Sequence, residues 1–356
     1  MKIGIITICD DGNLGNRLQN YAVQKTLEGV RSNISAETLK NTSKIGSMRR
    51  AITCIKRAIL KIRYTKRSTN FMEFNKAIKM SSKTYDYRRN NRRLAELYDY
   101  FLVGSDQVWN PNYGWLTPID LLEFARPEQR IAFSASFGVD RIPSNRKKEV
   151  AEQLMKFKRI SVREDRGKEI VEELTGRKDI EVLVDPTMLL GAEEWGRVAK
   201  RPDGVDDGEK FILVYFLGGL APEKRHAIEK ISKKMDWKII DIFDKTSKYF
   251  SCGPKEFLWL EKNAELICTD SFHSSVFAII NERPFVAFDR GGNDAKMNSR
   301  LDTLIAKFRL KNRWFNGEEI TPENMNIDYS GTKIILSEER RKSHNFIKKA
   351  LDIDEN

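Results

Sequence analysis

Short apolar runs alternate along the chain with longer segments in which apolar residues recur every three to four positions. The short runs are typical of buried strands, and the longer segments are typical of helices with one apolar face. The runs predict strands at Lys2–Ile8, Tyr100–Val103, Arg130–Ser134, Arg159–Val162, Ile180–Leu183, Phe211–Tyr215, Lys238–Ile242, Leu266–Thr269 and Pro284–Phe288. The longer segments predict helices at Leu14–Leu27, Asn145–Phe157, Arg166–Leu174, Pro222–Met235, Pro254–Asn263, Phe272–Ile280 and Ser337–Lys349. This alternation predicts the α/β class, with parallel sheets joined by right-handed crossovers.

The length of the chain indicates two domains, because 356 residues exceed what one ordinary core accommodates. The alternation of strands and helices breaks between Gly191 and Glu209, where aspartate, glycine and proline crowd together. We therefore predict an N-terminal domain over residues 1–190 and a C-terminal domain over residues 191–356. Both are expected to be Rossmann-like and to face each other across a cleft.

The charge balance is strongly basic. The chain has 63 lysines and arginines against 51 acidic residues, a formal net charge of +12, which favours anionic partners.

Its N-terminus has the pattern of a first strand and not of a signal peptide. No stretch has the roughly 18–20 apolar residues that a membrane span needs, so a cytoplasmic location is expected. Neither the four cysteines nor any histidine cluster has the spacing of a metal site, so no metal is expected.

One basic segment differs from the rest of the chain. Residues 44–93 contain 16 lysines and arginines but only two acids. Apolar residues recur within it at helical spacing, at Ile45, Met48, Ile52, Ile55, Ile59 and Ile62. The pattern predicts a basic amphipathic helix inserted in the N-terminal domain. It is open whether this helix packs on the core, docks residues 44–67 on an anionic membrane surface, or binds nucleic acid. The segment lacks a nucleic-acid recognition motif, so no nucleic-acid partner is expected.

A polar loop with two glycines follows the first predicted strand and opens the first predicted helix. Within it, Asn13 and Asn16 can bind a ligand or cap the helix, and Gly15 permits a tight turn. The spacing matches neither a dinucleotide fingerprint nor a phosphate-binding P-loop. A ligand contact and a plain helix cap are therefore equally consistent with this loop.

Two further strands of the N-terminal half end in polar or small residues. Ser105, Asp106 and Gln107 follow Tyr100–Val103, and Asp106 is a candidate general base or acceptor for sugar hydroxyls. The small residues around Phe137, namely Ser136 and Gly138, permit close approach of a ligand to the backbone.

Arg163 stands at the end of another strand. A guanidinium there can hold a carboxylate or phosphate with two parallel hydrogen bonds. An ion pair with the neighbouring Glu164 or Asp165 is the structural alternative.

The C-terminal half has a polar turn between a buried strand and a helix, where open α/β sheets bind their ligands. The turn and the first helical residues are Asp270, Ser271, Phe272, His273 and Ser274. Asp270 or Ser271 is the expected N-cap, and the exposed amides of such a turn favour an anion. A capping turn with an incidental histidine is the alternative. Candidate residues from neighbouring segments are Gly218, Arg290 and Arg300.

Several short motifs occur together in a fixed order. They are Asn-x-Gly-Asn-x-x-Gln-x-Tyr-Ala (13–22), Gly-Ser-Asp-Gln-Val-Trp-Asn (104–110), Ser-Phe-Gly (136–138), Ser-Val-Arg-Glu (161–164), Asp-Pro-Thr-x-Leu-Leu (185–190), Tyr-Phe-Leu-Gly (215–218), Thr-Asp-Ser-Phe-His (269–273) and Ser-Arg (299–300). In this order they resemble the polysaccharide pyruvyl transferase family, from about residue 3 to about residue 313.

The resemblance implies a fold similar to that of the two-domain GT-B glycosyltransferases. It implies transfer of a pyruvyl group from phosphoenolpyruvate to a sugar as a cyclic ketal, in capsule or exopolysaccharide synthesis, with phosphoenolpyruvate as donor and no cofactor. The basic segment resembles that of relatives whose acceptors are polyprenyl-linked, which implies a peripheral position on the inner face of the plasma membrane. A nucleotide-sugar glycosyltransferase of the same fold is the enzyme alternative, and a lipid-docked scaffold is the non-enzymatic one.

The resemblance also implies roles for individual residues. His273 matches the family's essential histidine, and Arg163 matches its donor-binding arginine. Some members have a basic residue where this chain has Ser271, so part of the donor's charge is expected to be met by Arg290 or Arg300. From the chemistry of the reaction, His273 is expected to protonate the donor or stabilise the leaving phosphate. Asp106 is expected to orient or deprotonate the acceptor.

Overall fold

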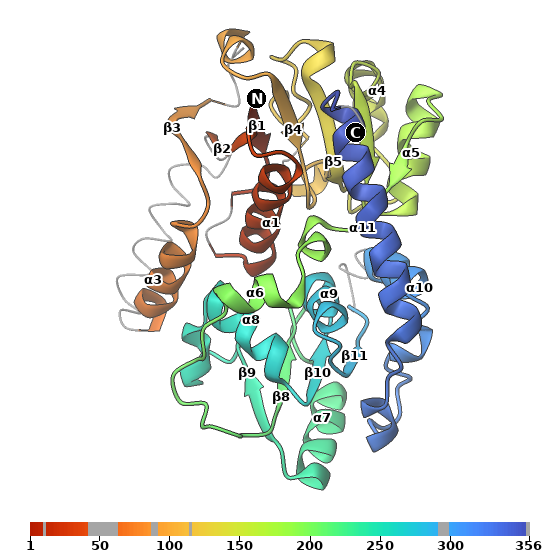
Figure 1. Ribbon diagram of the computed structural model, residues 1–356. Coiled ribbons are helices and arrows are strands. Elements are labelled where there is room, and N and C mark those ends of the chain that lie inside the picture. Colours follow the sequence, from red (N-terminus) through yellow and green to blue (C-terminus); the bar gives the residue numbers. More distant parts are fainter. Residues whose placement is uncertain (10–11, 42–62, 87–91, 114–115, 291–298, 354–356) are drawn as a thin grey trace. The chain divides into compact units, whose positions relative to one another are not determined.

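The computed structural model describes residues 1–9, 12–41, 63–86, 92–113, 116–290 and 299–353 (Figure 1). The chain forms two compact units. The first consists of the described residues of Met1–Ile55, Asn75–Leu189 and Glu338–Asn356, and the second of those of Lys56–Phe74 and Leu190–Ser337.

Neither unit is one continuous stretch of chain. The break between Leu189 and Leu190 adjoins the junction predicted from the sequence. The segment 63–74 groups with the second unit, although the predicted N-terminal domain included it. The final helix, α11 (Ser330–Ala350), begins in the second unit and ends in the first.

The first unit is built on a seven-stranded, entirely parallel sheet in the order β3-β2-β1-β4-β5-β6-β7. Its strands are β1 (Lys2–Ile6), β2 (Ser35–Asn41), β3 (Met80–Tyr85), β4 (Tyr100–Val103), β5 (Arg130–Ala135), β6 (Arg159–Val162) and β7 (Glu181–Val182). Parallel strands need crossover connections, and those from β1 to β2, β5 to β6 and β6 to β7 run through the helices α1 (Leu14–Val30), α4 (Lys147–Leu154) and α5 (Asp165–Thr175).

Both faces of this sheet are covered by apolar packing. Successive residues of a strand point to opposite faces, so the side chains of Ala132 and Phe133 in β5 pack on opposite faces of the sheet. Ala132 belongs to the core cluster that includes Val150 of α4 and Ile170 of α5. The Phe133 ring instead stacks on Phe346 of α11, with ring centroids 6.1 Å apart.

The second unit has a four-stranded parallel sheet in the order β11-β10-β8-β9. Its strands are β8 (Phe211–Tyr215), β9 (Lys238–Asp241), β10 (Leu266–Thr269) and β11 (Phe285–Ala287). Its helices are α3 (Arg63–Asn75, up to Phe74), α6 (Ala192–Val198), α7 (Pro222–Met235), α8 (Pro254–Asn263), α9 (Phe272–Ile280), α10 (Ser299–Lys307) and the start of α11.

The same alternation of faces organises this second sheet. Val214 of β8 lies in a core cluster with Ile228 and Ile231 of α7. Its neighbour Tyr215 packs on the other side, with its ring centroid 5.1 Å from that of Phe257 in α8. The polar residues that follow the strands are thus supported by packed layers on both sides.

Most predicted elements are confirmed within a residue or two, with four differences in extent. The first helix, predicted to end at Leu27, continues to Val30. The predicted helix Asn145–Phe157 is shorter, at Lys147–Leu154. The terminal helix starts earlier than the predicted Ser337, and the first strand ends at Ile6 instead of Ile8. The apolar pattern did not predict β2, β3, α3, α6 or α10.

The predicted basic amphipathic helix falls on residues 42–62, outside the described residues, so its docking remains an expectation. The two basic residues of segment 44–67 that the structure describes with side chains are engaged in the second unit. Lys66 pairs with Asp203 at 2.7 Å, and Arg67 donates to the carbonyls of Phe250 and Cys252. Among the described helices, none is both long and apolar enough to cross a membrane.

Candidate active site

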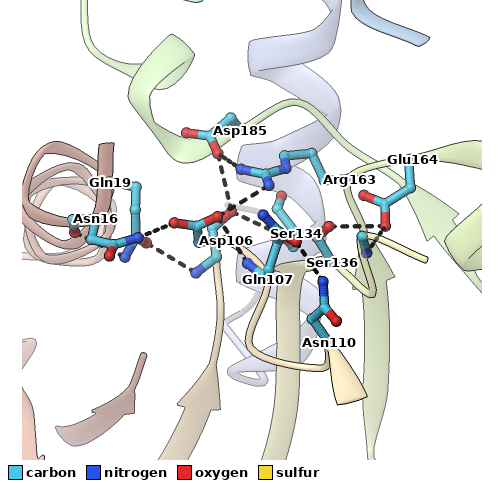
Figure 2. Close-up of polar contacts among 12 residues, drawn as sticks. Asn16, Gln19, Asp106, Gln107, Asn110, Ser134, Ser136, Arg163, Glu164 and Asp185 are labelled. Atoms are coloured by element: carbon cyan, nitrogen blue, oxygen red, sulfur yellow. Dashed lines mark hydrogen bonds and ion pairs between the residues drawn. The ribbon is translucent and has the colours of Figure 1, made fainter. Parts of the chain in front are cut away.

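The first unit collects polar side chains at the carboxyl ends of its central strands. β1, β4, β5, β6 and β7 are hydrogen-bonded neighbours in the sheet, so the residues that follow them meet at one edge. Asp106 follows β4, Ser136 follows β5, Arg163 follows β6 and Asp185 follows β7. Figure 2 shows these side chains pointing toward one another.

Asp106 is held at the centre of this cluster. Its carboxylate accepts hydrogen bonds from the amide side chain of Asn16 and from the backbone N–H of Gln107, the latter at 2.9 Å. The Nη2 atom of Arg163 lies 3.4 Å from Asp106 Oδ1. The Asp106 backbone has φ of 64°, in the left-handed region that non-glycine residues rarely adopt. Such strain is concentrated at functional sites, which supports Asp106 as a candidate.

Arg163 is ion-paired inside the unit, with only 1% of its side chain exposed. Its Nη1 donates to Asp185 Oδ2 at 2.5 Å, and the same oxygen accepts from Ser105 Oγ at 3.1 Å. Burial alone would lower the pKa of Arg163, but the nearby carboxylates of Asp185 and Asp106 outweigh burial and raise it. The ion-pair partners of Arg163 are thus Asp185 and Asp106. The sequence had offered Glu164 or Asp165 as the partner.

The N-terminal turn of α1 supports the cluster through amides. Asn13 is the N-cap, and its Oδ1 accepts from the N–H of Asn16 at 3.1 Å. Gly15 is buried within this turn. Gln19, one turn further on, accepts from the N–H of Ser105 at 3.1 Å and donates to Thr7. The loop therefore caps the helix, and through Asn16 it also contacts the candidate carboxylate.

The Ser136–Gly138 loop is organised by Glu164. Oε1 of Glu164 accepts from Ser136 Oγ at 2.9 Å, from the N–H of Phe137 at 3.0 Å and from that of Gly138 at 3.4 Å. Gly138 has φ of 59°, and a Cβ there would lie 2.2 Å from Gln107 Oε1. The space close to the backbone of residues 136–138, expected to admit a ligand, is therefore occupied by the side chains of Gln107 and Glu164.

The second unit collects polar groups at the ends of β8, β10 and β11. Asp270, directly after β10, accepts from the N–H of Leu217 at 2.7 Å and of Gly218 at 2.8 Å, both after β8. Arg290, beyond β11, donates through Nε to the Asp270 carbonyl at 3.2 Å, and Nε lies 3.4 Å from Asp270 Oδ2. Gly218 allows this approach, because a Cβ there would be 3.0 Å from Asp270 Oδ2.

His273 lies in the first turn of α9, which follows the same edge. Ser271 is the N-cap, with extended backbone and no capping hydrogen bond from its side chain. The rings of Phe272 and His273 meet edge to face at 5.4 Å, and the Arg300 guanidinium lies 6.0 Å from the Phe272 ring centroid. Ser274 turns toward α8 and donates to Glu261 Oε1 at 2.5 Å.

The second cluster is cationic and closely packed. Arg290 is 8% exposed, Arg300 6% and His273 9%, so all three side chains are largely shielded from water. Positive charge near a helix N-terminus favours a bound anion. Among the described residues, no group of histidine, cysteine and carboxylate side chains could hold a metal ion.

Sequence reasoning missed three residues of these clusters. Asp185 follows a predicted strand, but an aspartate before a proline can simply end a strand, so the sequence did not single it out. Gln19 lies three residues beyond Asn16 on one helix face, a spacing that could have been noticed. Glu261 gave no signal, because a Glu-Lys pair in a charged helix is normally solvent-exposed.

Comparison with solved structures defines the fold class. The UDP-GlcNAc 2-epimerase from Neisseria meningitidis, solved bound to UDP-GlcNAc, is similar with a TM-score of 0.52 and 12% identity, covering 99% of this chain and 98% of that one. A glycosyltransferase from Rickettsia africae ESF-5 gives a TM-score of 0.51 and 14% identity, covering 99% of each chain. The protein thus has the α/β fold, with parallel sheets, of the GT-B glycosyltransferases and epimerases.

The family follows from the sequence itself. Residues 13–292 match the family model of polysaccharide pyruvyl transferases, which is most of the chain. The protein therefore belongs to the polysaccharide pyruvyl transferase family and is a transferase. A search of the curated proteins found no match.

Proposed function

We propose that this enzyme transfers the pyruvyl group of phosphoenolpyruvate to two hydroxyls of a sugar, forming a cyclic ketal and releasing phosphate. The acceptor we propose is the sugar of a polyprenyl-linked polysaccharide precursor. The family membership supports a polysaccharide as the end product. The donor is argued below from the cationic cluster of the second unit.

The observation that carries the proposal is the grouping of cations at the start of α9. Phosphoenolpyruvate has a phosphate and a carboxylate attached to the same carbon, C2, and a binding site must compensate both charges. Arg290 and Arg300 supply fixed guanidinium groups, which suit phosphate and carboxylate. The N-terminal end of the α9 dipole adds a second source of positive potential, and the Ser271 side chain makes no capping bond there.

The reaction needs a proton donor and two nucleophilic hydroxyls. Protonation of C3 of the donor makes C2 electrophilic, and the first sugar hydroxyl attacks C2 and loses its proton. The bond from C2 to the phosphate oxygen then breaks, and its electron pair leaves with the phosphate. The second hydroxyl attacks C2 to close the ketal, and its proton passes to the leaving phosphate. The products are the pyruvylated sugar and inorganic phosphate.

We assign the proton transfer to His273, because an imidazole can give and accept protons near neutral pH. Its position in the first turn of α9 keeps it beside the groups assigned to the donor. Arg290 and Arg300 take the anionic groups in this assignment. Ser271, Phe272 and Gly218 shape the turn around them.

Asp106 is the carboxylate we assign to the acceptor hydroxyls. Asn16, Gln107 and Arg163 fix its orientation, and 5% of the residue is exposed.

The Arg163 side chain is 1% exposed and pairs with two carboxylates, Asp185 and Asp106, whereas that of Arg290 is 7% exposed and faces Asp270 through Nε. We therefore assign Arg163 to orienting Asp106 and not to holding the donor. This replaces the donor-binding role that the family resemblance suggested for Arg163.

The test is acceptor-dependent phosphate release from phosphoenolpyruvate by the purified protein. The product should gain the mass of one pyruvate less one water. His273→Ala should lower turnover by at least about a hundredfold, in line with the loss of a general acid. The matched control is His226→Ala, which removes an exposed histidine on α7. Near wild-type turnover by His273→Ala would refute the catalytic assignment.

A nucleotide-sugar glycosyltransferase is the second candidate, because the fold is shared with a solved glycosyltransferase. Parallel titrations with phosphoenolpyruvate and with UDP-sugars separate the two. Saturable binding of a UDP-sugar, with sugar transfer and no use of phosphoenolpyruvate, would favour the second candidate. Assays with lipid-linked and with free sugar acceptors then test the acceptor class.

A further inference from the structure

Glu261 is a carboxyl group buried in the interior of the second unit. It lies on α8 with 0% of its surface exposed. Its Oε1 accepts the hydroxyl hydrogen of Ser274 at 2.5 Å, and its Oε2 has no hydrogen-bond partner among the described residues. Burying a carboxyl group in this way is costly, so its presence calls for a reason.

The first turn of α9 lacks the usual support of a side-chain cap. Ser271 occupies the N-cap position, but its side chain caps no backbone N–H. Ser275 Oγ donates back to the Ser271 carbonyl within the same turn, at 3.2 Å. Ser274 is the residue of this turn whose side chain bonds to another helix in the described structure.

We propose that the Glu261–Ser274 pair is a positioning pair that fixes the first turn of α9 against α8, and with it the imidazole of His273. His273 and Ser274 are adjacent in one helical turn, so a rotation or shift of that turn moves both together. A displacement of about 1 Å at such a position is enough to reduce catalysis by about a hundredfold. The functional part of this inference rests on the proposed function.

The protonation state of Glu261 fits this role. Burial raises the pKa of Glu261 well above its usual value, and the hydrogen bond from Ser274 opposes this only in part. Tyr215, on β8, is a titratable group with which it interacts electrostatically. A neutral carboxyl on Glu261 can accept the Ser274 hydroxyl without placing a charge in the core.

The experiment combines histidine NMR with kinetics on the full-length protein. The chain has three histidines, at positions 226, 273 and 344, so the ring resonances are few and separable. The variants are Ser274→Ala, Glu261→Leu, Glu261→Gln and the double variant Glu261→Leu/Ser274→Ala. The matched control is Ser232→Ala, which removes a serine hydroxyl bonded to the Trp237 carbonyl in the same unit.

Ser274→Ala and Glu261→Leu should each displace the His273 ring resonance and leave those of His226 and His344 in place. Each should lower kcat for phosphoenolpyruvate about tenfold with a smaller change in KM, and the double variant should be no worse than the single ones. Glu261→Gln keeps an oxygen that can accept the hydrogen bond from Ser274. The His273 ring resonance should therefore stay in place, and kcat should stay within about twofold of wild type.

The NMR result separates this inference from the proposed function. If phosphoenolpyruvate is not a substrate, the kinetic assay reports nothing, but a displaced His273 resonance still supports the positioning pair. An unmoved His273 resonance in folded Ser274→Ala and Glu261→Leu would overturn the inference, whatever the donor. A displacement that Ser232→Ala reproduces would overturn it as well.

Discussion

Gly218 and Asp270 lie so close that a methyl group on residue 218 would come within 3.0 Å of the Asp270 carboxylate. The two residues follow β8 and β10, and the Gly218 N–H donates to Asp270 Oδ2 at 2.8 Å. The same carboxylate lies 3.4 Å from Nε of Arg290. The absence of a side chain at Gly218 thus lets the Asp270 carboxylate, after β10, contact the residues that follow β8 and β11.

Gly218→Ala should therefore disturb the cationic cluster without unfolding the protein. The added methyl group must push Asp270 aside, and Arg290 moves with it, so kcat/KM for phosphoenolpyruvate should fall by at least about tenfold. Steady-state phosphate release measures this. The control is Gly331→Ala, since a Cβ there meets nothing within 4 Å. Equal kinetics for the two variants would contradict the role given to Gly218.

Arg290→Gln should weaken donor binding. The substitution keeps part of the side-chain length but removes the charge assigned to an anionic group of the donor. We expect kcat/KM for phosphoenolpyruvate to fall by about a hundredfold or more, as for other fixed transition-state charges. The matched control is Arg225→Gln on α7, which removes a half-exposed guanidinium paired with Asp241. An equal loss of kcat/KM in both variants would show that the loss comes from the change in net charge and not from a donor site at Arg290.

Asp185→Asn should destabilise the first unit. It weakens the compensation of the buried Arg163 guanidinium and disturbs the bond to Ser105. Removing one partner of a buried ion pair costs about 3 kcal/mol in free energy of unfolding, measurable by urea denaturation. Asp179→Asn breaks a half-exposed pair with Arg177 and should cost no more than about 1 kcal/mol. Similar urea midpoints for both variants would show that the buried Arg163–Asp185 pair contributes no more to the free energy of unfolding than the half-exposed pair.

The stability of the second unit should fall with rising pH because of Glu261. Burial raises the pKa of Glu261 in the folded protein well above the value of 4.5 that it has when unfolded. The folded state thus holds a proton that the unfolded state releases. The corresponding stability is complete below pH 4.5 and is lost as pH rises through the folded pKa. Burial also raises the pKa of Tyr215, so its phenol stays neutral over this range.

Thermal unfolding of Glu261→Gln tests this expectation, since the amide cannot ionise. The difference in Tm between variant and wild type should grow in favour of the variant from about pH 5 to about pH 8. Glu223→Gln, at an exposed position of α7, serves as the control. A constant difference across this range would mean that Glu261 titrates normally in the folded protein.

The central strands could be read from the sequence, but the edge of the larger sheet could not. Strands such as Phe211–Tyr215 are buried on both faces and therefore appear as continuous apolar runs. β2 and β3 lie at one end of the first sheet, and Ser35–Asn41 and Met80–Tyr85 contain few apolar residues. β3 is the edge strand and β2 is its neighbour, and partly exposed strands of this kind give a weak pattern, so both were missed.

The candidate residues could be located from the sequence, while their partners could not. Strand ends mark where side chains such as Asp106 and Asp270 gather, because parallel strands end at one edge. The contact of Ser105 with Asp185 joins residues 80 positions apart, and that of Ser105 with Gln19 joins residues 86 apart. Pairing at such separations depends on the strand order, which the apolar pattern alone does not give.

The course of α11 has a consequence for how the protein is made. Because this helix begins in the second unit and ends in the first, Phe346 reaches the ring of Phe133 only after the second unit has been synthesised. Domains usually fold in order as they leave the ribosome. Here the unit that contains the N-terminus is completed last, so during translation one face of its sheet stays without its final apolar cover.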